Sequence, residues 1–163
     1  MALRAGHERA KHLQKHHLLT WARESSRALT SEAQQRARTT DKIEAANKAV
    51  QCLDSALEVY PGEPELTASK TALREYIASV KVAHWVELAE RAAFKGHYRR
   101  AIESYKDALF YLTRETVNEE VRVAGEQKIK DEIDSLRARL GMTRKNKDAG
   151  HGDSRNGGEV EQT

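Results

Sequence analysis

The sequence predicts an all-α protein, and three observations lead to this prediction. The chain has 163 residues with only two prolines and nine glycines, and residues that favour helices dominate it. Its apolar residues recur every three or four positions, which is the period of a helix that buries one face. Both prolines, together with Gly62 and Gly96, fall between the periodic segments, where the chain would turn. We therefore expect helical hairpins with an extended central helix, packed as a small bundle.

The first periodic segment runs from about Glu8 to Arg38 and is basic. Its expected packing face carries bulky or apolar residues at helical spacing: Leu13, His17 or Leu18, Trp21, and Ala28 or Leu29. Ser31 and Gln34 could form a capping box, so a break near Thr30 is an alternative to one continuous helix. Residues 1–38 hold eight Lys and Arg against three Asp and Glu, a net charge of 8 − 3 = +5. We assign residues 1–40 to a basic N-terminal helix that packs on the bundle.

The next two helices are separated by the stretch YPGEPEL. Asp41 is expected to cap the earlier helix, which must end before Pro61 because proline disfavours helix at the preceding residue. Pro64 suits the first turn of a new helix. No breaker follows it until Gly96, which predicts one helix of 32 residues, about 48 Å long at 1.5 Å per residue.

Two more helices are expected after the turn at Gly96. The fourth follows that turn and carries one apolar side: Tyr98, Ala101, Ile102, Tyr105, Ala108, Leu109 and Leu112. The fifth is expected to begin at Thr116, in a capping box with Glu119, and to end at Gly141. Its expected apolar stripe is Val117, Val121, Ala124, Ile129, Ile133, Leu136 and Leu140. The domain would thus span residues 41–140, and the polar residues 141–163 are expected to form a disordered tail.

The stretch WVELAERAAFKGHYRRAIESYKDALFYL resembles a tetratricopeptide repeat. Eight residues stand in the register of that repeat: Trp85, Leu88, Ala89, Gly96, Tyr98, Ala101, Tyr105 and Ala108. Ala89 replaces the usual glycine, and Ala92 stands where a tyrosine is common. Small residues at such positions let antiparallel helices approach closely, while Trp85 and Tyr105 fill the space beside them. The resemblance therefore implies tetratricopeptide-like (TPR-like) hairpins.

An earlier half-repeat resembles the second helix of the same motif. Ala49, Leu53, Ala56 and Pro61 have the matching spacing in AVQCLDSALEVYP. A regular repeat would place its tryptophan at Thr67, whereas it occurs at Trp85, an offset of 85 − 67 = 18 residues. Eighteen residues make five turns at 3.6 per turn, so the apolar face stays aligned. The offset predicts that the first helix of this repeat is lengthened by five turns.

Residues 82–140 also resemble the microtubule-interacting and transport (MIT) domain. That family is a three-helix bundle whose second helix follows a glycine and an aromatic residue, and its third helix usually offers a groove to a partner helix. The signature at Trp85 and Leu88, together with the upstream half-repeat, favours the tetratricopeptide resemblance.

The tetratricopeptide resemblance implies a groove along the first helix of the repeat. At 100° per residue, one stripe of the long helix lies apart from its expected packing face. The expected partner-binding residues on this stripe are Tyr76, Ala83, Val86, Glu90, Ala93 and Phe94. The basic and amide residues with which some relatives bind a terminal carboxylate are absent from the stripe. An amphipathic or basic segment is therefore the expected ligand.

Chemistry-bearing motifs are sparse in this sequence. His12 and His16 share a helix face, but the adjacent Lys11 and Lys15 would repel a metal ion. The single cysteine, Cys52, lies between apolar neighbours on an expected helix, and no glycine-rich phosphate loop follows a strand. No apolar run reaches the roughly 20 residues of a membrane span. We expect a cytoplasmic protein without enzymatic activity, cofactor or metal.

The function expected from the sequence is that of a protein-interaction scaffold that binds a peptide or partner helix. The alternative is a binder of nucleic acid or of an acidic partner through the basic N-terminal helix. Two repeat-like units fall short of the roughly three that usually bury a continuous core. The apolar stripe between Val117 and Leu140 could either cap the last hairpin, which is the main role we expect, or pair with another copy, so weak homodimerisation is a further expectation.

Overall fold

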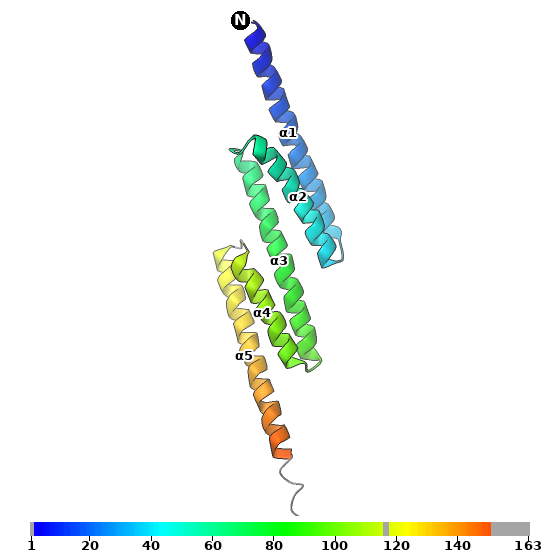
Figure 1. Ribbon diagram of the computed structural model, residues 1–163, viewed down its shortest axis with the longest axis vertical. Helices are drawn as coiled ribbons and strands as arrows, with labels where there is room; N and C mark the ends of the chain where they lie inside the picture. The colour runs from blue at the N-terminus through cyan, green and yellow to red at the C-terminus, as the bar shows by residue number, and fades with distance from the viewer. Residues whose placement is uncertain (1, 116–117, 151–163) are drawn as a thin grey trace, which may run out of the picture.

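The computed structural model describes residues 2–115 and 118–150, with side chains for residues 4–115 and 118–142. The described chain is all-α and contains five helices, and no strand occurs in these residues. The helices are α1 (Ala2–Gln35), α2 (Thr39–Val59), α3 (Pro64–Phe94), α4 (Tyr98–Arg114) and α5 (Glu119–Gly150). They form an elongated molecule in which α1 begins at one end and α5 extends past the other (Figure 1).

The long central helix forms as the sequence predicts. Pro64 occupies the first turn of α3, and the helix runs for 31 residues. It ends in a turn in which the backbone N–H of Gly96 bonds to Ala93 and that of His97 bonds to Ala92. Gly96 has a φ of +76°, the left-handed conformation that glycine adopts at helix ends without a steric penalty. The hairpin of α3 and α4 therefore turns where expected.

Two expected helix starts are placed differently. Helix α2 begins at Thr39, so Asp41 lies within its first turn instead of capping it. Helix α5 begins at Glu119, where the side chain of Asn118 accepts a 2.9 Å hydrogen bond from the backbone N–H of Glu120. Thr116, the expected cap of α5, lies outside the described residues.

The expected end of α5 at Gly141 is wrong. Helix α5 continues to Gly150, because Gly141 does not take the left-handed conformation that would end it; among the described residues only Gly96 has a positive φ. The expected disordered tail over residues 141–163 therefore begins too early, and residues 151–163 lie outside the described part of the chain.

Helix α1 is continuous, so the alternative break near Thr30 does not occur. The Thr30 hydroxyl donates a 2.6 Å hydrogen bond to the carbonyl of Ser26 one turn earlier, as a mid-helix threonine does. The expected packing face is partly wrong. Leu18 and Leu29 pack against the core, whereas Leu13 and Trp21 are 58% and 47% exposed. Small residues, Ala22, Ser26 and Ala33, are buried instead.

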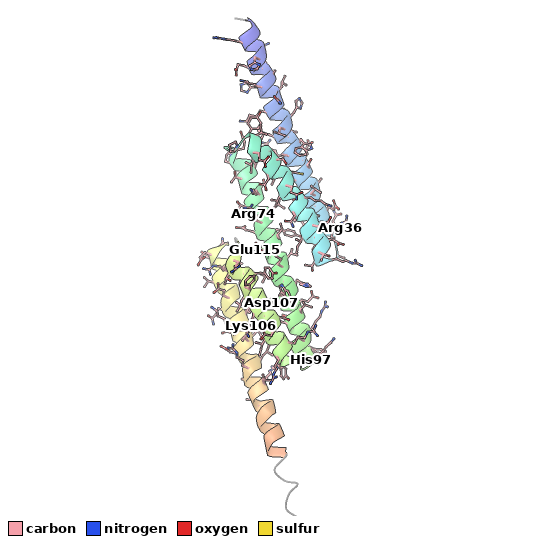
Figure 2. The ribbon with its side chains drawn as sticks, viewed as in Figure 1. Arg36, Arg74, His97, Lys106, Asp107 and Glu115 are labelled. Atoms are coloured by element: carbon pink, nitrogen blue, oxygen red, sulfur yellow. The ribbon has the colours of Figure 1, made fainter. Side chains whose placement is uncertain are left out.

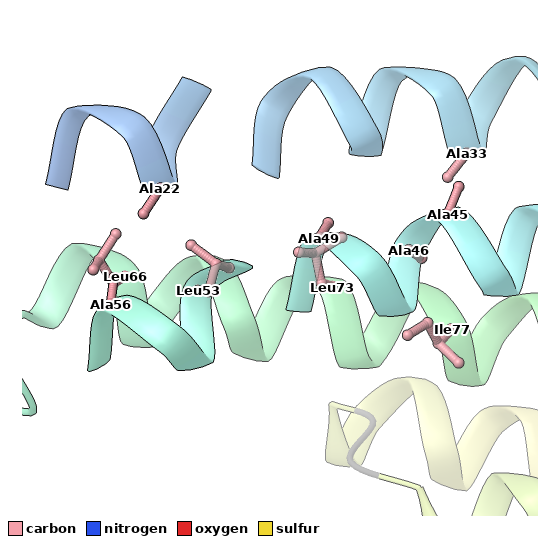
Figure 3. Packing of buried hydrophobic residues seen from close by; sticks show 10 residues of the cluster. All are labelled: Ala22, Ala33, Ala45, Ala46, Ala49, Leu53, Ala56, Leu66, Leu73 and Ile77. Carbon is pink, nitrogen blue, oxygen red and sulfur yellow. The ribbon is translucent and has the colours of Figure 1, made fainter. Parts of the chain in front are cut away.

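Helices α1, α2 and the first half of α3 enclose one core, which we call the N-terminal bundle (Figure 3). Six of its ten buried residues are alanines, and the ten are Ala22, Ala33, Ala45, Ala46, Ala49, Leu53, Ala56, Leu66, Leu73 and Ile77. Because alanine side chains are short, the helix axes can approach closely. Leu53 and Leu66 are the largest side chains that are fully buried among the described residues.

The second half of α3 packs with α4 and α5 around a separate core, which we call the C-terminal bundle. Its buried residues are Ala89, Ala92, Ala101, Ile102, Tyr105, Ala108, Leu112, Ile129, Ile133 and Leu136. The expected apolar side of α4 is confirmed, since every one of its seven residues lies in this core or packs against it. Helix α3 thus runs through both bundles and is the element that joins them (Figure 1).

Candidate partner-binding groove

A groove of about 300 Å³ lies between α3 and α5 in the C-terminal bundle, with α4 as its floor. It is lined by Ser79, Val82, Ala83, Val86 and Glu90 of α3, by Tyr105 and Leu112 of α4, and by Val121, Gly125, Lys128, Ile129 and Glu132 of α5. The surface of the groove is mainly apolar, and its charged residues lie toward one end. Such a hollow, apolar with a few polar groups, is the usual form of a binding site.

Small residues keep the groove open on both sides. Ala83 is exposed on α3 and lines the groove. Gly125 lies opposite it on α5, where a Cβ atom would come within 3.0 Å of the Leu112 Cδ2 atom. The missing side chain therefore lets α5 approach α4 closely. Val121, the first aliphatic residue of α5 along the groove, is 60% exposed. Apolar surface thus remains available to a ligand at this point.

One end of the groove is acidic. Burial, followed by the charges of Glu132 and then Glu90, raises the pKa of Tyr105. Both carboxylates therefore lie near the same phenol, one from each wall of the groove. Neither Glu90 nor Glu132 forms an ion pair within residues 4–115 and 118–142. Lys128 lies one turn before Glu132, so the local formal charge of these three residues is 1 − 2 = −1.

The opposite end of the groove is tied to α3 by an ion pair. Lys81 donates a 2.7 Å hydrogen bond to the Glu115 carboxylate, and its ammonium lies 5.5 Å from the centre of the Tyr111 ring. Glu115 is the residue that follows α4, beside the middle of α3 (Figure 2). This contact fixes the end of the groove's floor against one of its walls.

The structure brings together three of the six residues expected to bind a partner. Ala83, Val86 and Glu90 line the groove. They lie on successive turns of α3, as the 100° spacing predicts. The remaining three, Tyr76, Ala93 and Phe94, lie elsewhere.

The other three expected residues lie in three different places outside the groove. Tyr76 packs against the N-terminal bundle, and its hydroxyl lies 3.4 Å from the carbonyl of Ala33 in α1. Ala93 packs against the core of the C-terminal bundle. Phe94, the last residue of α3, is 94% exposed. The stripe of α3 that was expected to bind a partner is therefore interrupted. Tyr76 at its beginning contacts α1, and Phe94 at its end is the last residue of the helix and lies outside the groove.

Sequence reasoning did not predict that α5 forms a wall of the groove. Among its five lining residues, Val121 and Ile129 belonged to the expected apolar stripe of that helix, but Gly125, Lys128 and Glu132 did not. The residue that could have indicated this wall is Gly125, because an isolated glycine inside a helical pattern often marks a close approach of two helices.

Trp85 lies on another side of α3 and has a packing role. It packs against the core of the C-terminal bundle and stacks on Tyr111, with ring centroids 6.5 Å apart and planes at 13°. It is half-buried and does not line the groove. The residue that begins the tetratricopeptide-like pattern thus contributes to the hairpin of α3 and α4.

Within the described residues, no group of three His, Cys, Asp or Glu residues is arranged to hold a metal ion. In the same residues, no helix combines the length and apolar character that a membrane span requires.

Comparison with known proteins leaves the groove as the main indication of function. No family model, curated protein or solved structure matches this chain.

Proposed function

We propose that this chain is a non-enzymatic protein-interaction module whose α3–α5 groove binds a helical segment of a partner protein. The observation that carries the proposal is the groove itself, with a mainly apolar lining and two acidic residues at one end. A helix that presents a row of apolar side chains can lay them along such a groove. The resemblance to tetratricopeptide repeats supports the same function, and the cytoplasm is the compartment we propose.

The chemistry of the groove defines the preferred partner. Aliphatic side chains of the partner would contact Val82, Val86 and Ile129, while Lys or Arg at one end of the partner segment would face Glu90 and Glu132. Buried apolar area would supply most of the affinity, and the charges would select the orientation.

Ala83→Asp tests the proposal. This substitution places a carboxylate in the apolar part of the groove, at a position that is exposed and helical, so the fold should tolerate it. Ala68→Asp is the matched control, because Ala68 is also an exposed alanine of α3 but lies in the half that joins the N-terminal bundle.

Affinity purification with quantitative mass spectrometry would compare the two variants with the unsubstituted chain. Partners that bind the groove should be depleted at least tenfold by Ala83→Asp and retained by Ala68→Asp. Equal recovery by all three proteins would rule out the groove as the binding surface.

The second candidate function is binding of nucleic acid or of an acidic partner through α1. It is favoured by the exposure of every residue from 4 to 14, which include Arg4, Arg9 and Lys11. Phosphate contacts would make the affinity fall steeply with salt. Binding of a mixed-sequence duplex at 50 mM salt that is lost at 200 mM salt would favour nucleic acid as the ligand, and no binding at 50 mM salt would eliminate nucleic acid.

A further inference from the structure

Helix α1 carries an apolar face that its own bundle does not cover. Leu13 and Trp21 are 58% and 47% exposed, and Ala10 and His17 are exposed beside them. We call these four residues the outward α1 stripe. At 100° per residue they point away from the side of α1 that carries the buried residues Ala22, Ser26 and Ala33. Helical spacing thus gives α1 two faces, only one of which has a partner in the described chain.

The N-terminal part of this stripe lies on a basic segment that projects from the molecule. Helix α1 extends beyond the turn between α2 and α3 (Figure 1). Residues 4–17 contain Arg4, Arg9, Lys11 and Lys15 against the single acid Glu8, a formal charge of 4 − 1 = +3, together with four histidines. The segment is therefore an amphipathic basic helix.

Its chemistry matches the groove in the other half of the molecule. The outward α1 stripe offers Leu13 and Trp21 as apolar anchors, and Arg9 borders the stripe. The groove offers a mainly apolar lining, with the carboxylates of Glu90 and Glu132 at one end. Opposite charges at the edge of an apolar contact orient the two surfaces and speed their encounter.

We propose that the outward α1 stripe of one copy docks in the α3–α5 groove of a second copy. This inference rests on the proposed function of the groove and names its occupant. The contact cannot form within one chain, because α1 packs on the N-terminal bundle and projects away from the C-terminal bundle (Figure 1). Two copies that dock reciprocally satisfy both surfaces of each chain and form a closed dimer.

The charges also decide between this arrangement and a symmetric pairing of two α1 helices. A symmetric pair would bring two basic segments side by side, each with a charge of 3 − 1 = +2 because Lys15 is paired with Glu63, and like charges at close range oppose association. Docking in the groove instead brings the basic segment to two carboxylates that have no ion-pair partner in the described residues. The docked arrangement is therefore favoured.

A mixing experiment with full-length variants tests the proposal. Leu13→Asp inactivates the outward α1 stripe, and Ala83→Asp inactivates the groove; both residues are exposed, so the monomer fold should remain intact by circular dichroism and thermal melting. Light scattering at high micromolar concentration should give a dimer for the unsubstituted chain and for Ala68→Asp. Each of the two inactivated variants should be monomeric alone.

An equimolar mixture of Leu13→Asp and Ala83→Asp should form a 1:1 complex, because one has an intact groove and the other an intact stripe. This complex should be weaker than the dimer of the unsubstituted chain, since one contact forms instead of two. Two inactive variants that do not associate when mixed, or an unsubstituted chain that is monomeric, would overturn the inference.

The same variants separate failure of this inference from failure of the proposed function. If Leu13→Asp leaves self-association unchanged while Ala83→Asp abolishes binding of a different partner, only the inference fails. If Ala83→Asp changes neither self-association nor partner binding, both fail.

Discussion

Leu53→Ala should destabilise the N-terminal bundle selectively. Leu53 projects from α2 into the core and is fully buried. It shares that core with six alanines and with larger side chains such as Leu66 and Leu73 (Figure 3). Because alanine has no side-chain torsion that could carry atoms into a cavity, only these few larger side chains, or movement of whole helices, can fill the space left by truncation.

The expected loss follows from these surroundings. Leucine-to-alanine changes in protein cores cost about 3–5 kcal/mol, and the cost rises with the volume of the cavity that remains. We therefore expect Leu53→Ala to lower the free energy of unfolding by about 3–4 kcal/mol. For a chain of this size that corresponds to a fall in melting temperature of about 10 °C. Val59→Ala is the control, because Val59 lies on the same helix and is 58% exposed; it should change stability by less than about 0.5 kcal/mol.

Amide hydrogen exchange would localise the effect. Exchange should accelerate in α1, α2 and the first half of α3, while α4 and α5 should keep their protection, because their core does not include Leu53. Ile133→Ala should give the reverse pattern, since Ile133 is buried in the C-terminal bundle. Equal acceleration in both bundles would refute the description of two cores, and an unchanged melting temperature would refute the packing of Leu53.

Three further predictions concern turns, charges and pH. Gly96→Ala should cost about 1–2 kcal/mol in chemical denaturation, because alanine must adopt a positive φ although the space around it is open. Glu115→Gln should cost less than about 1 kcal/mol, since the pair with Lys81 is partly exposed, and 1 M salt should shrink the difference. Tyr105 has a pKa raised above 10.0, so its contribution to stability should be lost as the pH rises from 10 through that folded-state value. Glu90→Gln should lower the pKa of Tyr105, measured by NMR titration, without restoring 10.0, because burial is the larger cause.

The helices of this protein could be predicted well where local chemistry alone determines where a helix begins or ends. Pro64 begins α3 and Gly96 ends it, because each residue has backbone angles that suit only one end of a helix. The apolar side of α4 is equally clear, since it faces a core along its whole length. The same reasoning failed at Gly141, where a glycine in ordinary helical conformation does not stop α5.

The packing face of α1 could be predicted only in part from hydrophobicity. Leu18 and Leu29 pack against the core as expected, but Trp21 and Leu13 are exposed, and the small residues Ala22 and Ala33 are buried. Close packing of helices favours small side chains at the contact. A pattern analysis that ranks residues by hydrophobicity therefore misses these small residues.

The groove depends on tertiary structure and could be predicted only in part. Spacing along α3 identifies Ala83, Val86 and Glu90, but no local signal shows that α5 lies beside them. The spacing also does not show that Tyr76 contacts α1. The second wall, with Gly125 and Glu132, follows only from the packing of α4 against α5.

Site-specific photocrosslinking tests most directly whether the groove is the binding surface. A benzophenone amino acid would replace Ser79, which is exposed and lines the groove, and in a separate sample Ala68, which is exposed on the same helix outside it. We expect crosslinks to partner segments from position 79 to be at least tenfold more abundant than from position 68, and to disappear when Ala83→Asp is added. Equal crosslinking from both positions, or crosslinks that persist with Ala83→Asp, would contradict the assignment of binding to the groove.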